Sequence, residues 1–246
     1  MSYQPYEPLN CLKPITDNIW LVDGPIVEMS YVKVLSIPFP TRMTIIRLSG
    51  GRLVVHSPTL LTADLKTSVD ALGKVAFLLS PNRIHYVYLN SWKEAYPEAQ
   101  VWAAPDVREN VPDVAIDNVF GEDGAPDWGD EMRYVLVPGS YMTELEIFHN
   151  PSRTLVLTDL IENFEEDREG GTLMKIAMKC GGVVDPNGST PRDLRQTFSY
   201  KHKRTTKQAV EKMIAWGPER VIIAHGRWYE KDGTRELKRA FGWLLK

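Results

Sequence analysis

The sequence contains the stretch Arg42-Met-Thr-Ile-Ile-Arg-Leu-Ser-Gly-Gly-Arg-Leu-Val-Val-His56, in which two apolar runs are joined by a pair of glycines. The first run, 42–48, alternates apolar and polar residues as a half-buried strand does. Gly50-Gly51 predicts a tight hairpin, so the second run, 52–56, is predicted to be an antiparallel partner strand ending at His56. A side chain at the carboxyl end of a strand projects from the rim of a sheet, where α/β folds usually place ligands and chemistry.

Segments on either side of this hairpin predict a sheet covered by helices. Residues 15–23 alternate like another antiparallel strand. Thr62 is a cap-like residue before apolar positions at helical spacing, which predicts a helix over 62–72 that ends at Gly73. The continuous apolar run 75–79 is typical of a strand buried on both faces. A helix over 90–96 and a strand over 100–104 continue the alternation.

The second half of the chain predicts a second sheet with its own helices. The expected strands are 132–137, 144–148, 153–157 and 220–224, and the expected helices are 205–216 and 233–245. Turn residues predict a helix turn and a long surface loop over 106–130 and a loop over 181–191. The acidic stretch 162–169 is predicted to be a solvated loop or the start of a helix, and neither it nor 181–191 looks like a domain linker. This order of elements predicts one α/β domain over 1–246, built as a four-layer αββα sandwich.

Composition limits the classes of function. The chain has 246 residues, 43% hydrophobic and 25% charged, which excludes disordered and fibrous classes. Its formal net charge of −3 gives no electrostatic footprint for nucleic acid or a membrane surface, so we expect a small-molecule substrate or ligand. Two distant cysteines indicate a reducing compartment, and we expect a cytoplasmic protein. Seven tryptophans make a homodimer a reasonable expectation.

Five segments, taken in order, resemble the metallo-β-lactamase superfamily. The segments are Gly51–Pro58, Phe77–His85, Val137–Ser140, Ser152–Asp159 and Ile222–Gly226. More narrowly, His-Ser-Pro, Ser-Arg-Thr-Leu-Val-Leu-Thr-Asp and Ala-His-Gly resemble a divergent branch of that superfamily whose function is unassigned. The resemblance covers nearly the whole chain and implies the αββα fold. It also implies a hydrolytic site with one or two metal ions.

The sequence departs from the superfamily pattern at the first metal position. The superfamily loop Thr-His-x-His-x-Asp-His is replaced by Ser80-Pro-Asn-Arg-Ile-His-Tyr86, so Pro81 and Arg83 stand where histidines are expected. His85 stands on the aspartate position, and Pro-Gly-His has become Pro138-Gly-Ser140. A cationic Arg83 would oppose a divalent ion, so a dinuclear site is not expected.

The second metal position keeps its ligand types. On the resemblance, Asp159 matches the bridging carboxylate and His225 the final histidine, with His85 on the loop between them. Two imidazoles and a carboxylate suit zinc, iron or manganese, and three protein ligands leave positions open for a catalytic water. The sequence therefore predicts a mononuclear metal-dependent hydrolase in which metal-bound water attacks an ester, amide or phosphoester. His56 and Glu144 are the predicted catalytic supports, either orienting a ligand or acting as a base.

An alternative hypothesis is a non-catalytic, metal-free protein on the same scaffold that binds a small anionic ligand. Its predicted substrate-binding residues are Arg42, Asn82 and Arg83. Structural interpretations also stay open at this stage, because Asp159 could cap a turn and His85 could be a satisfied, partly buried histidine. His149 follows an apolar run in a turn with Asn150-Pro151 and is expected at the surface.

Overall fold

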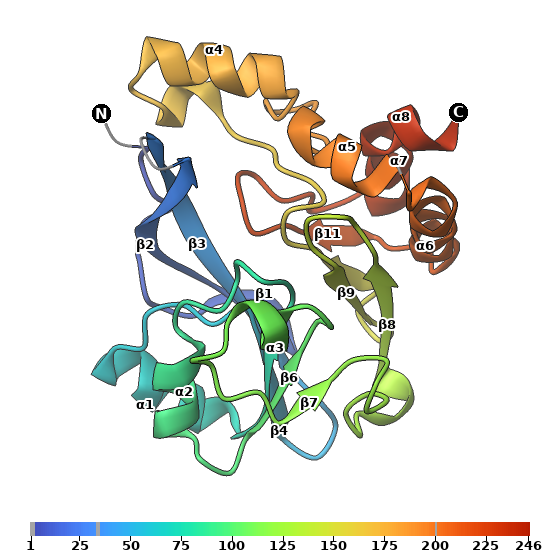
Figure 1. The fold of residues 1–246 in the computed structure, drawn as a ribbon. Coiled ribbons are helices and arrows are strands. Elements are labelled where there is room, and N and C mark those ends of the chain that lie inside the picture. The colour runs from blue at the N-terminus through green and yellow to red at the C-terminus, as the bar shows by residue number, and fades with distance from the viewer. Residues whose placement is uncertain (1–2, 33–34, 200) are drawn as a thin grey trace.

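The computed structural model describes residues 3–32, 35–199 and 201–246 and contains two β-sheets packed face to face (Figure 1). The first sheet has the strand order β1 to β7, and the second the order β11-β10-β9-β8. Strands of the first sheet are β1 Lys13–Thr16, β2 Ile19–Val32, β3 Leu35–Arg47, β4 Arg52–His56, β5 Lys74–Ser80, β6 Gln100–Ala103 and β7 Asn118–Val119. Strands of the second are β8 Met132–Val137, β9 Glu144–His149, β10 Thr154–Val156 and β11 Arg220–Ile222.

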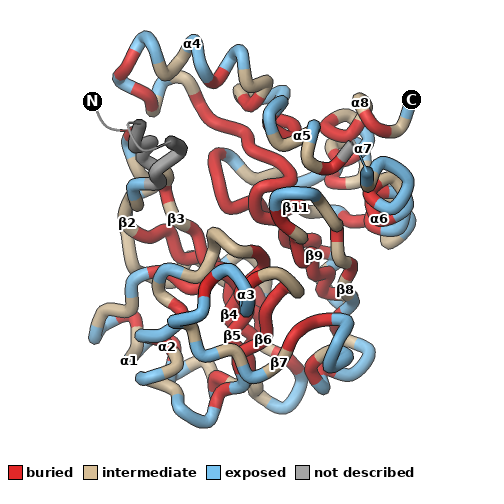
Figure 2. Tube along the Cα trace, viewed as in Figure 1, coloured by how far each residue is buried: buried red, intermediate tan, exposed pale blue. Residues whose placement is uncertain are grey.

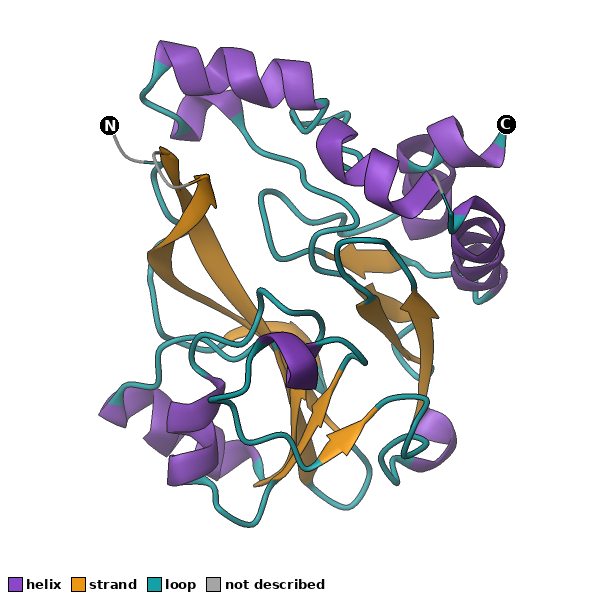
Figure 3. Ribbon diagram, in the orientation of Figure 1, coloured by secondary structure: helices purple, strands orange, loops and turns teal. Residues whose placement is uncertain are grey.

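Helices cover the outer face of each sheet, and one further helix, Thr172–Gly181, lies across the end of the β2–β3 hairpin (Figure 3). The helices are α1 Ala63–Leu72, α2 Leu89–Ala95, α3 Val107–Asn110, α4 Thr172–Gly181, α5 Arg192–Ser199, α6 Lys203–Ala215, α7 Gly233–Ala240 and α8 Gly242–Leu245. Short 3₁₀ turns cover Gly129–Glu131 and Glu166–Arg168. Among the residues that the structure describes, no helix combines the length and apolar character needed to cross a membrane.

Three apolar layers hold the sandwich together, and many of the buried residues lie in the strands (Figure 2). The first layer fills the space between the sheets, where Val54 and Leu79 of one sheet pack with Leu145 and Ile222 of the other. The second joins the first sheet to α1 and α2, and the third joins the second sheet to α6, α7 and α8. Removing this apolar surface from water is the main favourable contribution to folding. The predicted four-layer αββα architecture is therefore confirmed.

The deciding hairpin forms as predicted, with β3 and β4 antiparallel and Ile45 opposite Val55. The predicted strand 15–23 is instead two strands, because the turn at residues 17–18 separates β1 from β2. β2 and β3 form a longer hairpin than predicted. β2 continues to Val32 and β3 begins at Leu35, in a stretch for which the sequence predicted no strand.

Helices α4 and α5 were not predicted from the sequence. α4 begins after Gly171, whose lack of a side chain offers no capping group, and its start therefore carries no sequence signal. It lies across the end of the β2–β3 hairpin (Figure 1), where Met174 and Met178 pack with Phe39 and Phe164. The packing partners of α4 thus come from segments distant in the sequence.

Candidate metal centre

Strand register brings Asp159 and His225 to the same edge of the second sheet. β10 and β11 are parallel, with Val156 opposite Ile222. Asp159 and His225 each follow this pair by three residues, and the carboxyl ends of parallel strands meet at one sheet edge. His85 reaches the same place from the first sheet, on the turn that follows β5. The predicted convergence of the three residues is confirmed.

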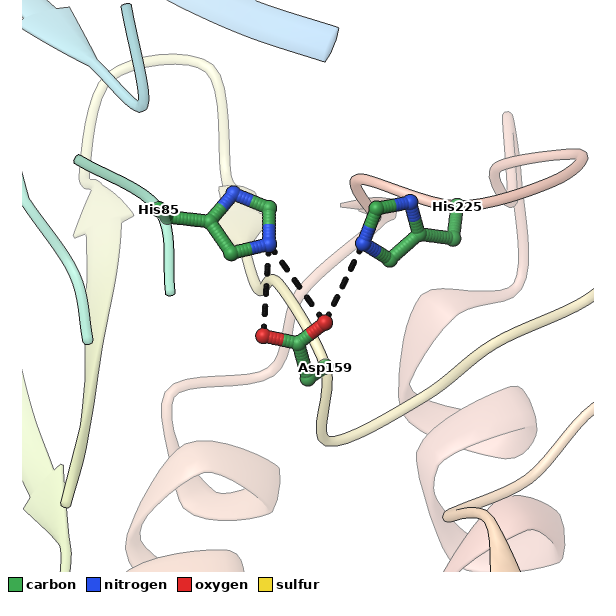
Figure 4. A group of neighbouring side chains, drawn as sticks. All are labelled: His85, Asp159 and His225. Atoms are coloured by element: carbon green, nitrogen blue, oxygen red, sulfur yellow. Dashed lines mark hydrogen bonds and ion pairs between the residues drawn. The ribbon is translucent and has the colours of Figure 1, made fainter. Parts of the chain in front are cut away.

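The three side chains point toward one another in the space between these loops (Figure 4). One potential ligand atom from each of His85, Asp159 and His225 lies within 4.8 Å of the others. Nε2 of His85 is 3.2 Å from Oδ2 of Asp159, and Nε2 of His225 is 3.1 Å from Oδ1. The two imidazole centroids are 5.2 Å apart. The carboxylate therefore lies between the two rings, and the Nε2 atoms of both rings face it.

Asn82 holds two members of this cluster in place. Its Nδ2 donates to Oδ2 of Asp159 at 2.6 Å and to the hydroxyl of Thr158 at 3.1 Å. Its Oδ1 accepts from the backbone amides of Ile84 and His85. Because Asn82 is fully buried, these bonds are shielded from water and fix the turn that carries His85.

His225 is fixed from behind by the first sheet. Its Nδ1 donates to the carbonyl of Pro40 at 3.0 Å, and Phe39 packs edge-on against its ring. Phe164 stacks on the same ring at a centroid distance of 6.4 Å. These aromatic contacts keep water away from the back of the imidazole, which leaves Nε2 facing Asp159.

Arg42 ties down the turn that carries His225. Its side chain is 3% exposed, its Nε donates to Asp23 at 2.8 Å, and its Nη1 donates to the carbonyls of Ile223 and Gly226. These carbonyls flank His225 in the sequence. The structure thus gives Arg42 internal partners, and the anion-binding role suggested by the sequence stays a prediction.

The electrostatics of the cluster follow from burial and mutual contact. Burial alone would raise the pKa of Asp159, but the two imidazoles outweigh it and hold that pKa below its ordinary value. Burial alone would lower the pKa of His85, but the charge of Asp159 raises it above its ordinary value. Burial keeps the pKa of His225 low despite the same carboxylate. Without a metal, His85 and Asp159 therefore form the charged pair.

The predicted catalytic supports lie around the cluster and do not contact it directly. Glu144 accepts from the amides of Thr158 and Leu160, on either side of Asp159. Burial and the charge of Asp159 raise the pKa of Glu144 to about 7. His56 is 1% exposed, hydrogen-bonds the backbone of Leu145, and has its pKa lowered by burial to about 3. Their catalytic roles stay predictions, whereas the orienting contact of Glu144 is present in the structure.

His149 and Arg83 lie outside the cluster. The expectation that His149 is at the surface is wrong: as the last residue of β9 it is 1% exposed, and its Nδ1 is 2.7 Å from the hydroxyl of Ser152. The strand continues one residue further than the apolar pattern indicates. Arg83 is half-buried, stacks on the ring of Tyr141 at 4.9 Å and donates to its carbonyl. Its predicted contact with a ligand stays a prediction.

The donor set fits a single divalent cation. Because Nδ1 of His225 donates to Pro40, the neutral ring carries no proton on Nε2, and this buried nitrogen has no hydrogen to share with Oδ1 of Asp159 at 3.1 Å. Buried polar atoms are nearly always hydrogen-bonded, so an orphaned nitrogen facing a carboxylate indicates a missing partner. Two neutral imidazoles and one carboxylate are ligands that zinc, iron and manganese all accept.

Sequence reasoning missed two residues that shape this site. Ser57 lies with its Oγ 2.7 Å from Nδ1 of His85, and Glu146 is fully buried beside Glu144 on β9. The segment His56-Ser57-Pro58 at a strand end was a usable signal for Ser57, because serine hydroxyls commonly orient imidazoles. Glu146 gave no signal, since an acidic residue alternating with apolar ones is typical of a solvent-facing strand position.

Residues 16–170 match a family described as a domain of unknown function, DUF4336. The chain belongs to this family. The match covers the strands and turns that carry His85 and Asp159, whereas His225 lies beyond it. No protein with a curated description matches the chain.

Solved structures similar to this DUF4336 chain include several metallo-β-lactamases. The metallo-β-lactamase FIM-1 from Pseudomonas aeruginosa, in its mono-zinc form, is 11% identical, with 99% of this chain and 97% of that chain covered and a TM-score of 0.62. A metallo-β-lactamase from Pontibacter korlensis is 10% identical, with 99% and 100% covered and a TM-score of 0.60. One from Hirschia baltica is 12% identical, with 98% of each chain covered and a TM-score of 0.57. At these identities the similarity shows the fold alone: the chain has a metallo-β-lactamase-like architecture.

Proposed function

We propose that this DUF4336 protein is a mononuclear metal-dependent hydrolase whose ion is held by His85, Asp159 and His225. The observation that supports it best is the meeting of three ligand atoms within 4.8 Å, from segments far apart in the sequence. A turn-capping role for Asp159 would not require its carboxylate to face two imidazoles. The orphaned Nε2 of His225 adds an independent reason for a cation between them.

The residues of the chain divide the work of such a site. A bound divalent ion would lower the pKa of a water ligand to about 7 and polarise a carbonyl or phosphoryl oxygen. Asn82 and Glu144 orient Asp159, one through its carboxylate and one through the amides beside it. Phe39 and Phe164 exclude water from the back of His225. An ester, amide or phosphoester is the substrate class that this chemistry serves.

The alternative, a metal-free protein that binds a small anion, receives less support from the geometry. Two of its three expected contacts, Arg42 and Asn82, are buried and bonded within the protein. Only Arg83 is partly exposed, and it stacks on Tyr141. If the purified protein holds no metal but is stabilised by anionic metabolites, and Arg83→Ala abolishes that stabilisation, the alternative is correct.

Metal content tests the proposal. We expect about one zinc, iron or manganese ion per chain, measured by elemental mass spectrometry, in protein purified without chelator. Asp159→Ala should retain little of it, because two imidazoles alone hold an ion weakly. Asp70→Ala removes an exposed carboxylate that pairs with Lys66 on α1 and should leave metal content unchanged.

Hydrolysis is the second measurement. Chromogenic ester, amide and phosphoester substrates should be cleaved by the loaded protein, and cleavage should stop with a chelator and return with added metal. Negligible metal in the wild type, even after incubation with zinc, ferrous iron and manganese, would overturn the metal site. Stoichiometric metal without hydrolysis of any of the three classes would overturn the enzymatic assignment.

A further inference from the structure

We infer that Ser57 is a positioning residue for His85. Its hydroxyl contacts Nδ1 and so orients the ring with Nε2 facing the metal ion. The inference rests on the proposed function and deepens it, because it assigns the group that prepares one ligand for binding. The contact between Ser57 and His85 is present in the metal-free protein.

Ser57 is held between the first sheet and the cluster. It follows the last residue of β4, it is 6% exposed, and its amide donates to the carbonyl of Leu79 at 3.0 Å. Its Oγ lies 2.7 Å from Nδ1 of His85. Because Nδ1 and Nε2 are on opposite sides of an imidazole, this contact directs Nε2 toward Asp159.

The backbone of Ser57 is strained. Its φ is 53°, a left-handed value that is uncommon for residues other than glycine, asparagine and aspartate. Asn10, Arg153 and Asp232 are the other non-glycine residues with positive φ in the described part of the chain, and none of them contacts the cluster. Strain of this kind persists where the surrounding structure over-determines it, and it is concentrated at functional sites.

The second imidazole of the cluster shows the same arrangement with a partner of known polarity. Nδ1 of His225 faces the carbonyl of Pro40, which can only accept, so the neutral ring carries its proton on Nδ1. Its Nε2 lone pair then faces Asp159. A serine hydroxyl can either accept or donate, so the contact with Ser57 allows the same tautomer for His85, in which Nδ1 donates to Oγ and Nε2 is free for the ion. Metal-ligating histidines almost always donate their other ring N–H to such a group.

Two substitutions separate the hydroxyl of Ser57 from its backbone. Ser57→Gly removes the hydroxyl and relieves the positive φ, whereas Ser57→Ala removes the hydroxyl and keeps a Cβ in the strained conformation. If Ser57 positions His85, both variants should bind Co²⁺ about 10- to 100-fold more weakly than the wild type, by competition with a chromophoric chelator. Their metal-free melting temperatures should differ, with Ser57→Gly the higher. Asn10→Gly relieves a φ of 52° away from the cluster and should bind Co²⁺ as the wild type does.

The visible absorption of bound Co²⁺ reports directly on ligand geometry. We expect the Ser57 variants to shift or weaken the ligand-field bands, and Asn10→Gly to keep the wild-type spectrum. Affinity within twofold of the wild type and an unchanged spectrum in both Ser57 variants would overturn the inference while leaving the proposed metal site intact. A wild type that binds no Co²⁺, Zn²⁺ or Fe²⁺ would instead show that the proposed function itself is wrong.

Discussion

At the level of single residues, a side chain of the site stabilises the fold in proportion to the number of buried polar groups with which it forms hydrogen bonds. Asn82 is the clearest case, because one amide bonds the carboxylate of Asp159, the hydroxyl of Thr158 and the amides of Ile84 and His85. No charged side chain could replace it without placing a like charge beside Asp159 or leaving one of these groups unpaired. The amide thus joins the two sheets at the place where the candidate ligands meet.

We expect Asn82→Leu to lower the free energy of unfolding by roughly 2–4 kcal/mol, because it leaves several buried polar groups unsatisfied in a site of nearly the same volume. Urea unfolding of the metal-free protein measures this. The matched control is Asn90→Leu, since Asn90 is exposed and its side chain bonds only the backbone of Asp113 and Ala115. A loss for Asn82→Leu no larger than for the control would show that the network stores little stability.

At the scale of secondary-structure elements, the turn after β11 determines where His225 points. Gly226 has a φ of 91° and bridges Asn163 of the neighbouring segment. A Cβ on Gly226 would fall within the backbone of Asn163, so the two segments can approach only because position 226 is glycine. Backbone bonds from Asn163 to His225 and from Arg227 to Asn163 then lock the turn.

Gly226→Ala should therefore destabilise the protein by about 3 kcal/mol or more and weaken metal binding, because the turn must open and carry His225 away from Asp159. Gly124→Ala is the control: its φ is 89°, nearly the same, but a Cβ there meets no atom within 4 Å. Strain alone should cost the control about 1–2 kcal/mol. Thermal unfolding and metal titration of both variants measure the difference, and equal effects would show that the close approach to Asn163 is unimportant.

For the whole molecule, an unusual feature is the burial of two adjacent carboxyl groups. Glu144 and Glu146 alternate with apolar residues along β9 and are both fully buried. Oε2 of Glu144 and both oxygens of Glu146 have no N–H donor or hydroxyl partner, and the hydrogen bond open to them joins the two carboxyl groups, with protonated Glu146 as its donor. Burial, together with the charge of Glu144, raises the pKa of Glu146 well above its ordinary value of 4.5. Protonation of Glu146 in the folded state therefore keeps a second negative charge out of the apolar layer.

This burial makes stability depend on pH. Glu144 and Glu146 keep their protons in the folded protein above pH 4.5, where the unfolded chain has released them, so their contribution to stability falls as pH rises from 4.5 through about 7 and beyond. His56 acts in the opposite direction between about pH 3 and 6.5, because burial lowers its folded pKa. Comparing the wild type with a variant that lacks one of the carboxyl groups separates their contribution to the free energy of unfolding from that of His56.

We expect Glu146→Gln to differ little from the wild type near pH 4.5 and to become more stable than it by on the order of 1–3 kcal/mol at pH 8. Chemical unfolding of the metal-free proteins across this range measures the difference. Glu98→Gln, at an exposed position, should shift stability equally at all these pH values. A wild type that is the more stable protein at pH 8 would contradict a free-energy cost of burying Glu146 at a pH where the unfolded chain ionises it.

The sequence by itself determined the layers of this protein. Alternating and continuous apolar runs predicted the strands, and the Gly50-Gly51 turn predicted the β3–β4 hairpin, because these signals depend on neighbouring residues only. The candidate ligands His85, Asp159 and His225 were named from the resemblance to the metallo-β-lactamase superfamily, whose second metal position they match. Helices α4 and α5, and the full length of β2 and β3, could not be predicted, since distant packing partners stabilise them.

Only the tertiary structure decided how the named residues are used. The residue type of Arg42 suggested an anion contact, and folding gives it partners that no local pattern indicates, namely Asp23 and the carbonyls of Ile223 and Gly226. Ser57 and Glu146 looked ordinary, yet Ser57 at the end of β4 contacts His85 beyond the neighbouring strand β5, and Glu146 is fully buried. Burial, hydrogen-bond partners and left-handed backbone angles depend on atoms from several segments at once, and no local pattern of residues specifies them.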